Sequence, residues 1–246
     1  VNGQMFFSRS PFTVCRLPLF MNFAIIVAAG SGTRFGANKP KQFLEVGGKP
    51  VIVHTLERFE NCVAVDRVIL VLAADEIDNF RQTATEYNLK KLVKIVAGGK
   101  TRTESVLSGL KSVEADSAEI IAVHDGARPL VTIEEISATI EKARECGAAC
   151  LVAPVTDTIK EVANGGIIGT IDRNRLRRAL TPQAFRFEIL REACAQNDLS
   201  SATDECFLVE KLGYEIAFVE GSARNIKITH QEDLRIAELF LSEPAI

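Results

Sequence analysis

The sequence lacks several features that would assign it to a specialised class of protein. It has no run of about 18 consecutive apolar residues, the length that a membrane-spanning helix needs. It also has no excess of basic residues: 29 lysines and arginines against 32 aspartates and glutamates leave a formal net charge of −3. A protein that binds nucleic acid or an anionic membrane usually shows a positive charge balance. We therefore expect no nucleic-acid partner and no membrane association.

Cysteine and histidine are too sparsely arranged for a structural metal site or a disulfide framework. None of the six cysteines forms a C-x-x-C pair, and a chain of 246 residues does not need disulfide cross-links. The three histidines, His54, His124 and His230, are too scattered to predict a catalytic triad or a zinc site. We expect free thiols in a reducing, cytoplasmic compartment.

Residues 1–20 differ from the rest of the chain. They mix arginine, serine, proline and isolated phenylalanines without a clear period, and a second possible start follows at Met21. A secretory signal peptide is not favoured, because positive charges interrupt the apolar stretches and no small-residue cleavage site follows. We expect residues 1–20 to be a disordered N-terminal extension and residues 21–246 to form one domain.

Short apolar runs alternate with helical patterns along residues 21–246. Most of these runs are continuous in valine, isoleucine, leucine and alanine, as expected for strands that are covered on both faces. This alternation predicts an α/β fold: a single doubly wound αβα domain with a mostly parallel sheet. The predicted strands are Phe23–Ala28, Val68–Leu72, Leu92–Val96, Ile120–Val123, Ala149–Val155 and Tyr214–Val219.

Two helices carry the sequence signature of a capping box at their start. Thr132 with Glu135 precedes one helix, which Gly147 should end. Thr229 with Glu232 repeats the pattern before the last helix.

One segment, from about residue 156 to residue 173, breaks the strand–helix rhythm. Two short apolar strands flank the turn sequence Asn164-Gly165-Gly166, which predicts a β-hairpin. An isolated hairpin buries little surface and is marginally stable in water. We expect a protruding β-hairpin arm that packs on another subunit.

A glycine-rich loop follows the first predicted strand. Ala28, Ala29, Gly30, Ser31 and Gly32 are small, so backbone N–H groups can approach a polyphosphate closely. The loop lies at the carboxyl end of a strand, where open α/β sheets bind ligands. Its spacing fits neither the Walker loop nor the dinucleotide fingerprint. A tight turn next to surface cations is the alternative for the loop taken alone.

Several short motifs occur in a fixed order: AAGSGTRFG, PKQF, GGKTRTESV, HDGARP, DRNRL, ALTPQ, TDE and NIKIT. In this combination they resemble the 2-C-methyl-D-erythritol 4-phosphate cytidylyltransferases of the non-mevalonate isoprenoid pathway. The resemblance covers nearly all of residues 21–246. It implies a nucleotidyltransferase domain whose β-arm interlocks two subunits, and the predicted hairpin falls where that arm should be.

The resemblance implies roles for the residues that should bind CTP. Arg34 and Lys41 would be the cations that stabilise the transition state, since phosphoryl transfer depends on fixed positive charge. Gly98, Gly99 and Ser105 would recognise the cytosine base. Thr103 of the same motif could instead be only a helix cap.

The motif around Asp125 closes a predicted strand. An aspartate at a strand's carboxyl end is well placed to hold Mg²⁺, which favours oxygen ligands together with substrate phosphates. We therefore assign Asp125 to the metal and, with Gly126, to the nucleotide. Arg128 could reach the acceptor phosphate; the alternative is a structural ion pair between Asp125 and Arg128.

The remaining acceptor-binding residues should come from distant parts of the chain. The resemblance implies that Arg173 and Lys227 act as catalytic, acceptor-positioning cations. If the arm crosses to a partner, its Thr158 and Arg173 would complete the neighbouring site. The alternative for Arg173 is one surface charge among several in its run.

These assignments predict a magnesium-dependent, homodimeric cytidylyltransferase. It would move CMP from CTP to the phosphate of 2-C-methyl-D-erythritol 4-phosphate and release pyrophosphate. The alternatives are a cytidylyltransferase for another polyol or sugar phosphate, and a nucleotide-binding regulatory protein without catalysis. The second alternative is disfavoured, because a pure binder has no need of Arg34, Lys41, Asp125, Arg173 and Lys227 together.

Overall fold

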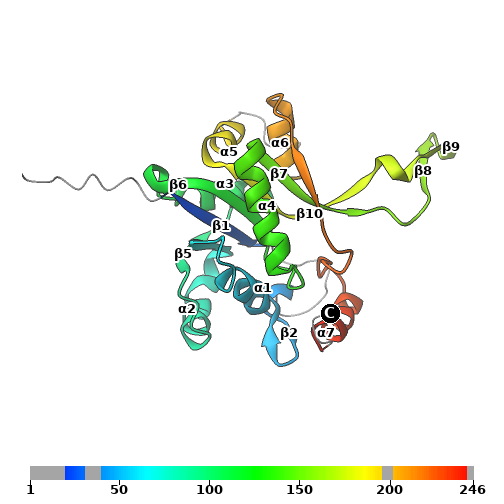
Figure 1. Cartoon of the computed structure of the whole chain (residues 1–246). Helices are drawn as coiled ribbons and strands as arrows, with labels where there is room; N and C mark the ends of the chain where they lie inside the picture. The colour runs from blue at the N-terminus through cyan, green and yellow to red at the C-terminus, as the bar shows by residue number, and fades with distance from the viewer. Residues whose placement is uncertain (1–19, 31–39, 196–201, 243–246) are drawn as a thin grey trace, which may run out of the picture.

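A computed structural model describes residues 20–30, 40–195 and 202–242 of the chain. Its centre is a seven-stranded sheet with strand order β11-β7-β10-β6-β1-β4-β5 (Figure 1). All neighbouring pairs are parallel except those that β10 makes with β6 and β7. The strands are β1 (Met21–Ala28), β4 (Arg67–Leu72), β5 (Leu92–Ala97), β6 (Ala118–Asp125), β7 (Ala148–Pro154), β10 (Arg177–Arg186) and β11 (Ala217–Glu220). The mostly parallel sheet confirms the predicted fold class.

Helices cover both faces of the sheet because side chains alternate along each strand. On β1, Ala24 and Ile26 pack with α1, α2 and α4, whereas Phe23 and Ile25 pack with α3, α5 and α6. The last helix, α7, joins a smaller apolar cluster beside the two-stranded β2–β3 sheet (Figure 1). The helices are α1 (Val51–Glu60), α2 (Ile77–Glu86), α3 (Arg102–Lys111), α4 (Ile133–Cys146), α5 (Phe187–Cys194), α6 (Glu205–Lys211) and α7 (Gln231–Ser242), and the small strands are β2 (Glu45–Val46) and β3 (Lys49–Pro50). Among the described residues, no helix is long and apolar enough to cross a membrane.

Helix capping agrees with the sequence at α4 and differs from it at α3 and α7. Thr132 and Glu135 form the predicted capping box, and α4 ends at Gly147 with a φ of 93°. At α3 the cap is Thr101, not Thr103. Before α7 the predicted partner is wrong: the carboxylate of Asp233, rather than that of Glu232, accepts the N–H groups of Thr229 and His230.

Two strands depart from the sequence prediction. The strand β10 was not predicted, because its middle holds Pro182 and polar residues that are unusual in a central strand. It tolerates them because its ladder to β7 is irregular between Ala179 and Gln183. The strand β11 begins at Ala217 rather than Tyr214, whose side chain is exposed.

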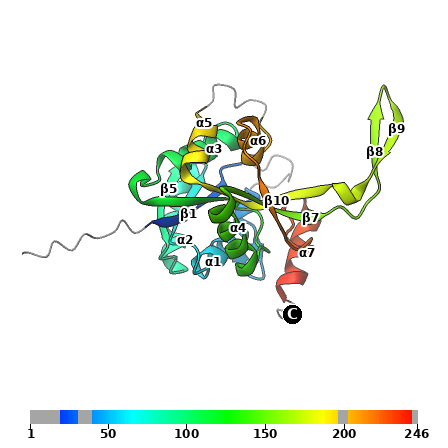
Figure 2. The same ribbon diagram turned by 45° about the horizontal axis from the view of Figure 1, so that its top comes forward.

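The predicted hairpin is present and projects from the sheet (Figures 1 and 2). It consists of β8 (Ile159–Ala163) and β9 (Gly166–Ile171), which pair antiparallel across a turn at Asn164 and Gly165 with positive φ values. Val162 and Ile167 are both 68% exposed, so the arm leaves apolar side chains without cover in the single chain.

Candidate active site

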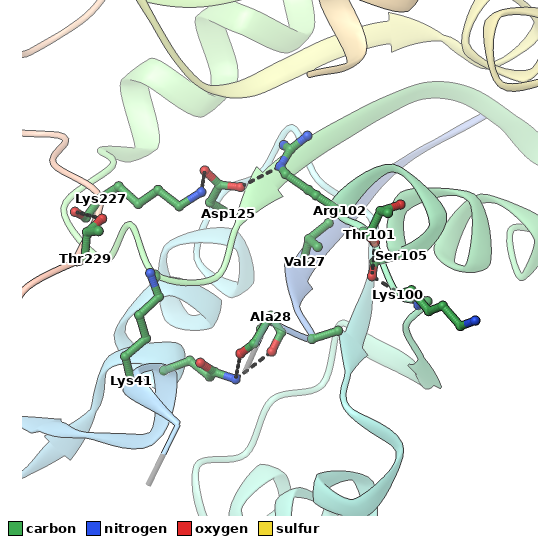
Figure 3. A pocket seen from close by; sticks show the side chains of 15 residues that line it. Val27, Ala28, Lys41, Lys100, Thr101, Arg102, Ser105, Asp125, Lys227 and Thr229 are labelled. Atoms are coloured by element: carbon green, nitrogen blue, oxygen red, sulfur yellow. Dashed lines mark hydrogen bonds and ion pairs between the residues drawn. The ribbon is translucent and has the colours of Figure 1, made fainter. Parts of the chain in front are cut away.

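A cavity of about 480 Å³ lies at the carboxyl ends of β1 and β6 and at the start of α3 (Figure 3). This is the edge at which an open parallel sheet binds ligands. The lining residues are Val27, Ala28, Ala29, Gly30, Lys41, Gln42, Gly99, Lys100, Thr101, Arg102, Ser105, Asp125, Ala127, Lys227 and Thr229. The predicted residues Ser31, Gly32 and Arg34 lie outside the described residues, as do residues 1–19 of the predicted extension.

The first residues of the glycine loop are held in place by Gln42. This side chain is 3% exposed, and its Nε2 donates to the carbonyl oxygens of Ala28 at 2.7 Å and Gly30 at 3.3 Å. Gln42 follows the predicted cation Lys41 directly in the PKQF motif. Gln42 was not predicted as a site residue; its place beside Lys41 was the available signal.

The second loop of the cavity packs tightly against the first. A Cβ atom at Gly98 would lie 2.4 Å from the Cβ of Ala29 and 2.7 Å from the Oγ of Ser105, so only glycine fits there. The N–H of Gly99 donates to the Oγ of Ser105 at 3.2 Å. The three predicted base-binding residues, Gly98, Gly99 and Ser105, thus lie together, and the last two line the cavity.

Asp125 lies at the end of β6 in contact with three cationic side chains. Its Oδ1 accepts from the Nε of Arg102 at 3.0 Å. Its Oδ2 lies 3.0 Å from the Nζ of Lys227 and 3.3 Å from the Nε of Arg128. Burial opposes the charge of this carboxyl, but the attraction of Arg102, Lys227 and Arg128 outweighs it and holds the pKa of Asp125 well below its usual range. Asp125 is therefore ionised throughout the neutral pH range.

Arg102, which was not predicted as a site residue, links Asp125 to a second carboxylate. Its Nη1 donates to both oxygens of Glu205, at 2.7 and 2.8 Å, across a separation of 103 residues. Burial disfavours the Arg102 charge, yet Glu205 and Asp125 keep its pKa above the ordinary value. Burial raises the pKa of Glu205, and Arg102 opposes that rise. The sequence shows Arg102 only as one residue of the GGKTRTESV motif.

Lys41 and Lys227 lie at the same edge of the cavity (Figure 3). The Nζ of Lys41 donates to the carbonyl oxygen of Ile228 at 2.7 Å. The Nζ of Lys227 reaches Asp125, and its side chain is 38% exposed. Two of the predicted catalytic cations therefore meet in one cavity, although one follows the first strand and the other follows the last.

Arg128 and Gly126 lie behind the cavity wall rather than on it. Arg128 is 12% exposed; besides Asp125, it donates through Nη1 to the carbonyl oxygen of Asn225 at 2.8 Å. This geometry favours the structural ion pair between Asp125 and Arg128. At Gly126 a Cβ atom would lie 2.7 Å from Ile52 and 2.8 Å from Ala28, so the backbone passes close to both.

Thr158 and Arg173 belong to the projecting arm and do not line the cavity of their own chain. The Nη1 of Arg173 donates to the carbonyl oxygen of Thr156 at 2.5 Å, and Arg173 is exposed. The structure of one chain thus separates these two residues from the other predicted acceptor-binding residues.

Asp125 is also the residue through which the cavity could hold a divalent cation. Among the described residues, no three His, Cys, Asp or Glu side chains cluster as a metal-binding group. Mg²⁺ commonly uses one or two protein carboxylates and completes its octahedron with water and substrate phosphates. The ionised Asp125 carboxylate could serve as one such ligand if Lys227, which contacts Oδ2 together with Arg128, moved away.

Comparisons with known proteins agree on one family. The family described as 2-C-methyl-D-erythritol 4-phosphate cytidylyltransferase matches residues 22–243. A protein of that name from Bacillus licheniformis is 44% identical over 224 residues, which cover 90% of this chain and 96% of that protein. One from Syntrophotalea carbinolica is 42% identical and covers 90% of this chain and 97% of the relative.

Solved structures agree with the sequence relatives. The crystal structure of 4-diphosphocytidyl-2C-methyl-D-erythritol synthase from Anaerococcus prevotii superposes with a TM-score of 0.81 at 30% identity, covering 91% of this chain and 97% of that chain. The 2-C-methyl-D-erythritol 4-phosphate cytidylyltransferase from Thermus thermophilus gives a TM-score of 0.71 at 31% identity, over 89% of this chain and 98% of that chain.

Proposed function

This chain belongs to the 2-C-methyl-D-erythritol 4-phosphate cytidylyltransferase family, and from that premise we propose that it transfers CMP from CTP to 2-C-methyl-D-erythritol 4-phosphate. The products are pyrophosphate and 4-diphosphocytidyl-2-C-methyl-D-erythritol, an intermediate of non-mevalonate isoprenoid biosynthesis. The names of the relatives favour this acceptor over another polyol or sugar phosphate. The observation that carries the proposal is the meeting of Lys41, Lys227, Arg102 and Asp125 at one cavity.

The chemistry needs no general base. The acceptor's phosphate has its second pKa near 6 and is largely a dianion at pH 7. It can attack the α-phosphorus of CTP in line while pyrophosphate leaves. The protein's contribution is positioning and the stabilisation of negative charge on the phosphoryl oxygens.

The residues of the cavity divide this work. The small residues Ala28, Ala29 and Gly30 leave room for the triphosphate, and Gly99 and Ser105 lie where the base would be read. Lys41 stabilises the crowded α-phosphate, and the assignment of Arg34 to the same task remains part of the proposal. Lys227 is the cation that orients the attacking phosphate.

Magnesium dependence is part of the proposal. A bound magnesium ion would supply positive charge that offsets the negative charge of the triphosphate. Asp125 is the residue that would hold it, since its carboxylate is ionised and faces the cavity. Lys227 would then move from Asp125 to the acceptor phosphate, which its partial exposure permits.

The active enzyme is proposed to be a cytoplasmic homodimer joined through the arm. The arm exposes Val162, Ile167 and Ile168, each more than 60% exposed, which are poorly placed in water. It also carries Thr158 and Arg173 away from their own cavity. In a symmetric dimer the two arms would cross, and each would supply these residues to the neighbouring site.

Turnover by the purified chain tests the function. With CTP, magnesium and 2-C-methyl-D-erythritol 4-phosphate, the protein should release pyrophosphate. This release should stop when a chelator removes the metal. Ribitol phosphate and sugar 1-phosphates serve as competing acceptors. A faster reaction with one of them would replace the proposed acceptor, and no pyrophosphate with any acceptor would contradict catalysis.

A further inference from the structure

The ion pair between Arg102 and Glu205 is unusual in its depth. Glu205 is the first residue of α6 and is fully buried, with an exposed fraction of 0%. Arg102 is the first residue of α3, and its side chain is 25% exposed where it borders the cavity. Its Nη1 contacts both Glu205 oxygens while its Nε donates to Asp125, so two nitrogens of the guanidinium group are held.

A buried ion pair needs a reason beyond stability. Taking two charges out of water is costly, and well-packed apolar residues in their place are often as stable or more stable. The contact between Arg102 and Asp125 supplies a reason, because the Nε of Arg102 donates to the Oδ1 of Asp125 at 3.0 Å. The dashed line in Figure 3 marks this contact, which reaches Asp125 from the side opposite Lys227.

The segment around Glu205 is itself anchored to the central sheet. Asp204 accepts the N–H of Phe207 as the α6 cap and also accepts from the Nε2 of Gln183 on β10 at 2.8 Å. The Oε1 of Gln183 accepts the N–H of Cys206 at 3.2 Å. Glu205, between Asp204 and Cys206, is therefore a fixed point from which Arg102 can be held.

We propose that Arg102 is a positioning residue: Glu205 anchors its guanidinium, which holds Oδ1 of Asp125 and so keeps Oδ2 on the side of Lys227, where the cavity would hold the metal and the phosphates. Without this hold, Lys227 and Arg128 would still contact Oδ2, but nothing would hold Oδ1, and the Asp125 carboxylate could rotate about its terminal bond. This inference rests on the proposed cytidylyl transfer and adds to it a pair of residues that need not touch the substrate.

Three variants test the pair in the full-length protein. Arg102→Lys keeps the charge but cannot hold Glu205 and Asp125 with one planar fork. Glu205→Gln keeps the shape but weakens the anchor. Each should lower kcat by roughly 10- to 100-fold, as loss of a supporting partner typically does, with KM for CTP changed much less. The paired change Arg102→Met with Glu205→Met should retain the fold and show the same loss.

Arg144 on α4 provides a matched control, because it contacts Glu119 near the start of β6, the strand that ends in Asp125. Arg144 bridges Glu119, near the start of β6, and Glu141 on α4, far from the cavity. Arg144→Lys should leave kcat unchanged, and melting curves should show whether each variant is folded. If Arg102→Lys lost activity only in proportion to its unfolded fraction, the role would be structural and the proposal would be overturned.

A double-mutant cycle separates positioning from direct contact. If Arg102 acts through Asp125, the loss in Arg102→Gln with Asp125→Asn should equal the larger single loss rather than their product. Multiplying losses would mean that Arg102 acts on the substrate itself, which would contradict the proposal. Calorimetric titration of magnesium in the presence of CTP adds a readout without turnover: Glu205→Gln should weaken magnesium binding, while CTP affinity at saturating magnesium changes little. Unchanged magnesium binding and turnover in Glu205→Gln would overturn its anchoring role. A wild-type protein without transferase activity would instead overturn the proposed function.

Discussion

The Nζ of Lys41 donates a 2.7 Å hydrogen bond to the carbonyl oxygen of Ile228, so residues 187 positions apart meet at the mouth of the cavity. Ile228 is the neighbour of Lys227, whose ammonium group pairs with Asp125. The two lysines are thus tied to one backbone segment, and a movement of that segment would shift both cations relative to the bound phosphates.

The first prediction concerns Lys41→Ala. It should lower kcat by about 100- to 1,000-fold, the usual effect of removing one fixed donor from developing negative charge. Steady-state kinetics with CTP and the acceptor provide the measurement. Lys49→Ala is the control, since Lys49 pairs with Glu57 outside the cavity. An equal loss in Lys49→Ala would show that net charge, rather than the position of Lys41, controls the rate.

The second prediction concerns Gln42→Met. The substitution keeps the side-chain length but leaves the carbonyl oxygen of Ala28 without the 2.7 Å donor. An unsatisfied buried acceptor costs about 1–3 kcal/mol. We expect that loss in urea unfolding, together with a raised KM for CTP, because the loop start is no longer held. An unchanged KM would mean that Gln42 supports the fold alone.

The third prediction tests whether sites are shared between subunits. Lys41→Ala should remove a catalytic cation from the cavity, and Arg173→Ala should remove the cation that the arm supplies to the neighbouring site. Each variant alone should therefore be nearly inactive. After the two are mixed in equal amounts and allowed to exchange subunits, random pairing restores about a quarter of the sites in a symmetric dimer. Absence of any recovery, despite proven exchange, would place Arg173 outside its partner's site.

The fourth prediction concerns the oligomeric state. Ile167→Asp puts a charge on the exposed apolar surface of the arm and should shift the protein to monomers in analytical ultracentrifugation, with loss of turnover. Val63→Asp is the matched control, because Val63 is 91% exposed but lies in a turn far along the chain from the arm. A dimer that survived Ile167→Asp would point to a different interface.

The fifth prediction concerns pH and His124. Burial lowers the pKa of His124 from 6.5 to about 3, so the folded protein keeps this ring neutral while the unfolded chain binds a proton below about pH 6.5. Stability therefore falls as pH falls, and the His124 contribution between pH 7 and pH 4.5 is about 2.5 kcal/mol. His124→Gln should show a correspondingly smaller decrease in its free energy of unfolding. Equal decreases would show that His124 titrates normally in the fold.

The local signals in the sequence predicted the parts of the fold that depend on neighbouring residues. The continuous apolar runs of β1 and β4 predicted buried strands, and Thr132 with Glu135 predicted a helix start. The hairpin turn at Asn164 and Gly165 was equally local. In each case the physical cause lies within a few residues, so no tertiary context is needed.

The parts that were missed depend on partners far along the chain. Nothing near Arg102 indicates that Glu205 will lie 2.7 Å from it, because the contact exists only after α3 and α6 pack on the same sheet face. The strand β10 was missed for the same reason: β6 and β7 impose an extended form on a segment with a proline. The cap of α7 depends on whether Glu232 or Asp233 accepts the N–H of Thr229. The spacing in the sequence favoured Glu232, whereas Asp233 is the acceptor.

The reversed direction of β10 has a mechanical consequence. The chain leaves the sheet through β7, forms the arm and returns as β10, which pairs with β7 at residues 177–179 and 183–185 and with β6 at residues 183–186. The arm is therefore joined through β10 to β6, the strand that ends in Asp125. We therefore expect that a substitution at residues 177–179, where the arm joins the sheet, can change the position of Asp125 without touching any ligand.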